Sequence, residues 1–145
     1  MSKKLKAGLE FEFQYDVSSS NTVPSVFPDS EEFKVMPEVF ATAFMVGFME
    51  WACIKFLVPY LNWPEELTLG TDVNVSHLAG TPIGSTVTAK VRLFEIDGKR
   101  LVFEVEAYDD LDLIGKGFHE RHIVSKQRFV DKMNDKSQKI QDLKK

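Results

Sequence analysis

The stretch from Val39 to Leu57 constrains the fold most, because it is too apolar for the surface of a globular domain and carries only two charges, Glu50 and Lys55. A helix that is apolar nearly all round is normally covered on most sides, so we expect it at the centre of the domain. A carboxylate in such a helix is costly unless it is paired. Glu50 is therefore expected either to take part in chemistry or to hold a hydrogen-bond network together.

The composition is that of one globular domain with no obvious polyanionic partner. The 145 residues are enough for one core and too few for two. A net charge of −4 without a dense basic stripe argues against nucleic-acid binding. Cys53 is the only cysteine, and no three ligands have convincing metal spacing, so neither a disulfide framework nor a metal site is expected. No apolar stretch follows the basic residues at the start, and Glu50, Lys55 and Pro59 favour a core helix over a membrane span, so we expect a cytoplasmic protein that binds no membrane.

The pattern along the chain predicts a single α+β domain over residues 1–145. The polar, proline-containing segment 18–36 predicts a lid loop. The central helix is expected over 37–58, with Pro37 in its first turn, and the charged tail 127–145 is expected to form a peripheral helix with a thin apolar stripe. Alternation of apolar and polar residues predicts five strands, at 9–17, 68–78, 85–94, 101–107 and 113–124. An antiparallel sheet wrapped around one long helix is the hotdog fold.

Three polar side chains, those of Thr42, Glu50 and His77, are expected to face this apolar interior. Thr42 and Glu50 are eight residues apart, about 12 Å along a helix axis, so they border one elongated pocket or opposing pockets across a dimer seam. His77 continues the face of Val73 and Val75 and should point at the helix. A hydroxyl, a carboxylate and an imidazole together suit acyl transfer or hydrolysis. Each also has a structural explanation, since a helical threonine can bond a preceding carbonyl and a buried histidine can be a satisfied core residue. The residues alone indicate an enzyme or a ligand binder.

Four segments carry a resemblance to a known family. They are Met36 to Cys53, Leu69 to Thr71, His77 to Gly84 and Ile114 to Arg121. All four are similar to segments of the fluoroacetyl-CoA thioesterase family, and the likeness covers nearly the whole chain apart from the tail. The resemblance implies a hydrolase of short-chain acyl-CoA thioesters that acts as a homodimer, with no cofactor beyond the CoA moiety of the substrate.

The resemblance also implies roles for individual residues. The catalytic threonine, glutamate and histidine of the family fall on Thr42, Glu50 and His77. Gly70 would be a backbone group near the thioester. Arg121 would either contact the substrate or support the site by pairing with a glutamate.

One position departs from the family pattern. The family's lid carries two phenylalanines, and this chain has Phe33 and Met36 at these positions. Methionine is flexible and fills irregular space, so it would make a looser gate and leaves the specificity for the fluoroacetyl group open. Two alternatives to hydrolysis remain: a hotdog hydratase or dehydratase acting on acyl thioesters, and a non-catalytic protein that binds acyl-CoA or another small ligand.

Overall fold

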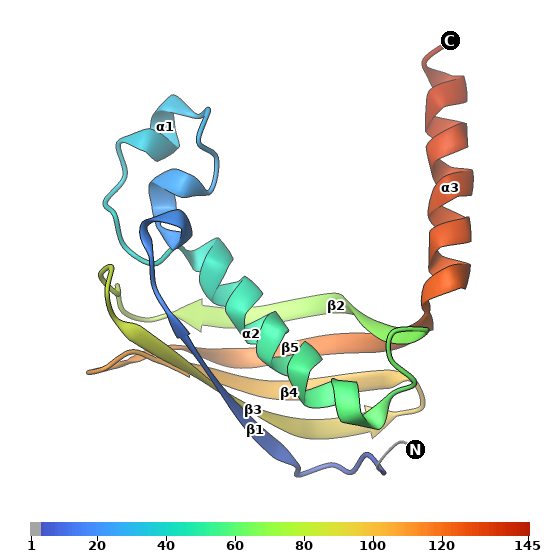
Figure 1. The fold of residues 1–145 in the computed structure, drawn as a ribbon, viewed down its shortest axis with the longest axis horizontal. Coiled ribbons are helices and arrows are strands. Elements are labelled where there is room, and N and C mark those ends of the chain that lie inside the picture. Colours follow the sequence, from blue (N-terminus) through green and yellow to red (C-terminus); the bar gives the residue numbers. More distant parts are fainter. Residues whose placement is uncertain (1–3) are drawn as a thin grey trace.

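The computed structural model describes residues 4–145 and has an antiparallel sheet with one long helix across its face. In Figure 1 the helix α2 lies diagonally over the sheet, a lid segment containing α1 stands at one end, and α3 stands at the other. The elements are β1 (Glu10–Asp16), η1 (Ser19–Asn21), η2 (Val23–Ser25), α1 (Glu31–Lys34), α2 (Thr42–Leu57), η3 (Val58–Tyr60), β2 (Glu66–His77), β3 (Thr86–Asp97), β4 (Arg100–Tyr108), β5 (Leu113–Ser125) and α3 (Lys126–Leu143). The α+β arrangement expected from the sequence is confirmed.

The sheet has the strand order β1-β3-β4-β5-β2, with all neighbours antiparallel. β2 therefore lies at one edge and pairs only with β5, from Glu66 opposite Ser125 to His77 opposite Gly115. Among residues 4–145 no strand pairs with the outer side of β2. This leaves a twelve-residue strand with one open edge next to the helix.

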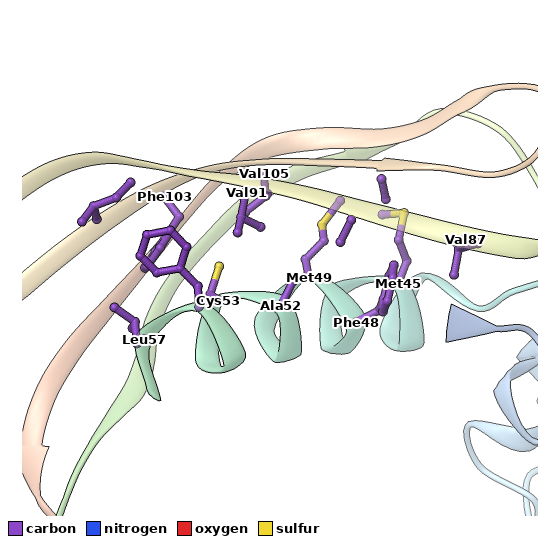
Figure 2. Close-up of a cluster of buried hydrophobic side chains, with 14 of the residues drawn as sticks. Met45, Phe48, Met49, Ala52, Cys53, Leu57, Val87, Val91, Phe103 and Val105 are labelled. Atoms are coloured by element: carbon purple, nitrogen blue, oxygen red, sulfur yellow. The ribbon is translucent and has the colours of Figure 1, made fainter. Parts of the chain in front are cut away.

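The core lies between α2 and the inner face of the sheet. Figure 2 shows side chains of the helix pointing at the strands, where they meet valines of β3 and β4 and Phe103. Cys53 belongs to this core, and burial raises the pKa of its thiol far above the ordinary value, so it is an inert packing group. Gly115 allows α2 to approach β5 closely, because a Cβ there would lie 2.6 Å from the sulfur of Met45. The buried residues of α2 are Met45, Phe48, Met49, Ala52, Cys53, Phe56 and Leu57.

The sequence predicts that the central helix begins at Pro37, but in the structure it begins at Thr42. The segment 37–41 is not helical, because its backbone pairs with distant segments: Val39 forms a bridge with Pro82, and the Phe40 N–H donates to the carbonyl of Thr81 at 2.8 Å. A proline can start a helix, but this tertiary hydrogen bond keeps residues 37–41 out of the helix, which begins only at Thr42.

The side of α2 that faces away from the sheet is open. Ala43 and Gly47 are exposed there, so the helix is covered on one side and not on most sides, while the partly exposed Trp51 and Lys55 lie against Phe13 of β1. By length and composition alone Thr42–Tyr60 could cross a membrane, a test that the core helix of a globular protein also passes. Its buried residues all belong to the hydrophobic core that it forms with the strands.

Candidate active site

The first centre is a hydroxyl–imidazole pair at the start of α2. Thr42 Oγ1 and His77 Nδ1 lie 2.7 Å apart, joining the first residue of the helix to the last residue of β2. His77 Nε2 is buried and has no hydrogen-bond partner in the described part of the chain. A hydroxyl bonded to an imidazole whose other nitrogen is unused is the arrangement in which histidine can accept a proton from the hydroxyl.

Backbone N–H groups converge on the same place. The first hydrogen bond within α2 runs from the Met45 N–H to the carbonyl of Ala41 at 2.8 Å. The N–H groups of the three residues between them therefore have no partner within the helix. Such groups at a helix N-terminus, with the positive end of the helix dipole, can stabilise a developing oxyanion.

The second centre is an ion pair at the middle of the helix. Arg121 Nη1 donates to Glu50 Oε2 at 3.2 Å. Arg121 is buried and its remaining donors are fixed by Thr68, with Nε on the hydroxyl and Nη2 on the carbonyl, both at 2.8 Å. The apolar sequence around Glu50 predicts a deeply buried carboxylate, but this prediction is wrong. Glu50 faces the open β2 edge and keeps 36% of its side chain exposed.

His119, which is not among the residues predicted from the sequence, completes this second centre. Its Nδ1 lies 2.8 Å from the carbonyl of Asp72, so Nδ1 carries the proton, and Nε2 accepts from Arg121 Nη1 at 3.0 Å. Burial lowers the pKa of His119, which favours this neutral form. A signal was available, because His119 is two residues from Arg121 and thus on the same face of β5.

Gly70 lies directly against the carboxylate of the second centre. A Cβ at this position would be 2.9 Å from Glu50 Oε2 and 3.3 Å from Arg121 Nη1. The contact is too close for any other residue unless the carboxylate moves. Glycine at this position lets the backbone of β2 lie close to the carboxylate of Glu50.

The lid holds the two candidate gate residues. Phe33, in α1, packs against Phe27 with ring centroids 5.4 Å apart. Met36 follows α1 and is 47% exposed. Because Met36 leads into the segment 37–41 that precedes α2, the lid is joined directly to the Thr42 end of the helix.

The structure therefore unites the sequence-derived residues in two groups and not in one. Thr42 meets His77, whereas Glu50 meets Arg121 and Gly70. Eight residues of helix, about 12 Å along the axis, separate Thr42 from Glu50, so one carbonyl cannot touch both within a single chain. Both groups lie along β2, one of the two edge strands of the sheet. Across residues 4–145 no cluster of three or more His, Cys, Asp or Glu side chains could hold a metal ion.

Several known proteins are similar to this chain in sequence and in fold. Residues 17–127 match the family model described as fluoroacetyl-CoA-specific thioesterase. A fluoroacetyl-CoA thioesterase from Streptantibioticus cattleyicolor is 43% identical over 137 residues, which are 94% of this chain and 98% of the relative. A solved mutant of the fluoroacetyl-CoA-specific thioesterase FlK, in complex with fluoroacetate and CoA, is 45% identical with a TM-score of 0.84 and covers 86% of this chain and 99% of its own. A hot-dog-like protein from Thermanaerovibrio acidaminovorans, 24% identical with a TM-score of 0.76, covers 90% of this chain and 91% of its own.

A five-stranded antiparallel sheet around a central helix, with polar groups along one strand, defines a hotdog-fold protein. The extent of the match settles the relationship more narrowly. The chain belongs to the fluoroacetyl-CoA-specific thioesterase family.

Proposed function

We propose that this protein is an acyl-CoA thioesterase that hydrolyses short-chain acyl-CoA thioesters. Membership of a thioesterase family supports the reaction class, and a relative bound to CoA and fluoroacetate supports the substrate class. The observation that carries the proposal is the 2.7 Å contact between Thr42 and His77 beside free helical N–H groups. Apart from water and the substrate's own CoA moiety, this reaction needs no cofactor. A cytoplasmic location suits it.

At the first centre, His77 acts as the base. Its Nδ1 accepts the proton of the Thr42 hydroxyl, or of a water that this hydroxyl positions, and the freed oxygen attacks the thioester carbonyl. The oxyanion forms near the unpaired N–H groups at the start of α2. The CoA thiolate then leaves and is protonated, which completes the cleavage when water is the attacking group. When Thr42 attacks, water must also hydrolyse the acyl-threonine ester that this attack forms.

At the second centre, Arg121 positions Glu50. Arg121 has donors committed to Glu50, His119 and Thr68, so it holds the carboxylate and does not face the substrate. Glu50 then serves as a second base or nucleophile with its accessible oxygen. Gly70 keeps the backbone clear for the thioester beside it.

The two centres serve one thioester when two copies join through β2. Antiparallel pairing of the open edges makes a homodimer and reverses the order of the centres along the seam. The Thr42–His77 pair of one copy then meets Glu50 of the other. The open β2 edge and the partial exposure of Glu50 support this shared site.

Phe33 and Met36 form the gate for the acyl group. The exposed, flexible Met36 closes the pocket less tightly than an aromatic ring would. We therefore propose that the enzyme accepts a wider range of short acyl groups than an enzyme with two phenylalanines.

The test is release of free thiol from acetyl-, fluoroacetyl-, propionyl- and longer-chain CoA esters. We expect turnover of several short esters, and a loss of about 100-fold or more in Glu50→Gln. Glu104→Gln, on the outer face of β4, is the matched control and should keep its rate. Hydration of an enoyl-CoA without thiol release would establish a hydratase instead. Saturable binding of acyl-CoA without any turnover would establish a binding protein.

A further inference from the structure

The helix α3 carries an apolar stripe that its own chain leaves bare. The stripe begins at Phe129 and Met133, which are partly buried near the end of β5. It continues to Ile140, which is 42% exposed, and Leu143, which is 85% exposed. No residue of α3 is buried. Figure 1 shows the helix extending past the β2 edge, away from its own sheet.

The charge of this helix is opposite to that of the rest of the protein. Residues 126–145 hold six lysines, one arginine and three aspartates, a net charge of +4. The whole chain carries −4, so residues 1–125 carry −8. A basic helix with an apolar stripe is therefore complementary to the body of a second copy of the same protein.

The register of the sheet shows where on a second copy the helix would lie. α3 leaves β5 at Ser125, which pairs with Glu66 at the start of β2. If two β2 edges pair antiparallel with His77 of one copy opposite Gly70 of the other, as the shared site requires, Glu66 of one copy is level with position 81, in the 78–85 loop that follows β2 of the other. Inward from His77 lie Gly115 of β5 and Ala107 of β4. Since α3 is about 27 Å long and strands are spaced about 4.8 Å apart, it crosses the ends of several strands of the second copy.

The surface at those strand ends matches the helix. Two loops meet there, 78–85 and 109–112, and they present exposed apolar side chains among aspartates. Leu111 is 92% exposed at the tip of the second loop. The remaining exposed apolar residues and the aspartates of the two loops are Leu78, Ile83, Asp110 and Asp112.

We propose that α3 is an arm that docks across the 78–85 and 109–112 loops of a second copy, an inference that rests on the homodimer proposed above. The apolar stripe covers Leu111 and its neighbours, and the arm's lysines pair with the aspartates. The same loops anchor the lid, because Thr81 bonds both the Phe40 N–H and Asp109. The arm of one copy thus touches the support of the other copy's lid.

A basic amphipathic helix also suits an anionic membrane surface. Two features favour the second copy. The stripe is interrupted at Lys136 and Ser137, and the body's charge of −8 would be repelled by anionic lipid. The arm also leaves the sheet beside β2, one of the two edge strands and the one that carries both polar centres.

Zero-length carbodiimide cross-linking, followed by mass spectrometry, tests the arm. Within one copy α3 and the 109–112 turn lie at opposite ends of the molecule (Figure 1), so a bond between them has to join two copies. We expect links from the arm's lysines to Asp110 or Asp112. In Ile140→Glu combined with Leu143→Glu their yield should fall by about tenfold or more, because the apolar contacts are lost.

The control is Asn134→Glu with Gln141→Glu, which makes the same charge change away from the stripe and should keep the yield of links. Equal helix content by circular dichroism ensures that both variants retain α3. A dimer in sedimentation whose arm–turn links are absent, or equal in the two variants, overturns the arm and leaves the dimer. A monomer overturns both, while thiol release still reports on the proposed activity. Binding to phosphatidylserine vesicles that depends on Ile140 and Leu143 would assign the stripe to a membrane and contradict the proposal.

Discussion

Arg121 is the residue on which the second centre depends, and its neighbours explain why it can stay buried. A buried guanidinium is costly unless its donors are satisfied, and here Glu50, His119 and Thr68 accept from it. Burial lowers the pKa of Arg121, although arginine remains charged in proteins. His119 takes part only as a neutral ring, since its Nε2 needs a lone pair facing the cation.

The neutral state of His119 predicts a pH-dependent stability. Burial lowers the pKa of His119 in the folded protein, whereas the unfolded chain has the ordinary value of about 6.5. The unfolded chain therefore takes up the proton at higher pH, and the free energy of unfolding falls as the pH drops below about 6.5. His119→Gln keeps an acceptor for Arg121 but does not titrate.

The measurement is the urea midpoint at about pH 7 and about pH 5. It should drop less over this range in His119→Gln than in the wild type. His122→Gln, which removes a histidine bonded to Thr71 outside this network, is the control and should keep the larger drop. An equal drop in wild type and His119→Gln would contradict the role given to His119.

Sequence reasoning at this scale found the residues but not their grouping. Thr42, His77, Glu50 and Arg121 stood out by type and position, yet strand phase alone cannot show which helix residue meets which strand residue. His119 was missed because its position two residues before Arg121 indicates a shared face of β5 but not that the two side chains bond to each other. Its partner Asp72 acts through a backbone carbonyl, which any residue type could supply.

At the scale of elements, the contact between β2 and α2 determines where Glu50 points. Gly70 provides the space, since a Cβ there would lie 2.9 Å from the carboxylate. The carboxylate is the end of a flexible side chain, so it can move aside without unfolding the protein, and the His119 ring, 3.1 Å from that Cβ, has to shift by only a few tenths of an ångström. Gly70→Ala should therefore alter geometry more than stability.

We expect Gly70→Ala to lower kcat by about tenfold or more, because small displacements of a reacting group are costly in rate. Its melting temperature should change little. Gly47→Ala is the matched control: a Cβ there meets nothing within 4 Å, and alanine favours a helix over glycine by about 1 kcal/mol. That variant should be more stable and fully active. An unchanged kcat in Gly70→Ala would show that turnover does not depend on the exact position of the Glu50 carboxylate.

The elements themselves were largely predictable, because the alternation of β4 and the apolar run of α2 are local signals. The start of α2 was not. Pro37 favours a helix locally, but the hydrogen bond from Phe40 to Thr81 joins residues far apart in sequence. The open side of α2 was missed for a similar reason, since an apolar helix does not show whether its own sheet or another chain covers it.

At the scale of the whole molecule, several features are incomplete in one chain. β2 has an open edge, Glu50 beside it keeps a partly exposed carboxylate, and α3 carries a bare stripe. The two polar centres lie about 12 Å apart along the helix, with Thr42 in one and Glu50 in the other. A second copy joined through β2 would account for all of these features at once.

The most direct measurement is therefore thiol release by a mixture of two inactive variants, Glu50→Gln and His77→Ala, refolded together in equal amounts. If each site takes its histidine from one copy and its carboxylate from the other, half of the dimers contain one intact site. The mixture should then recover about a quarter of the wild-type rate, although each variant alone is inactive. A mixture as inactive as its components would contradict a site shared between two copies.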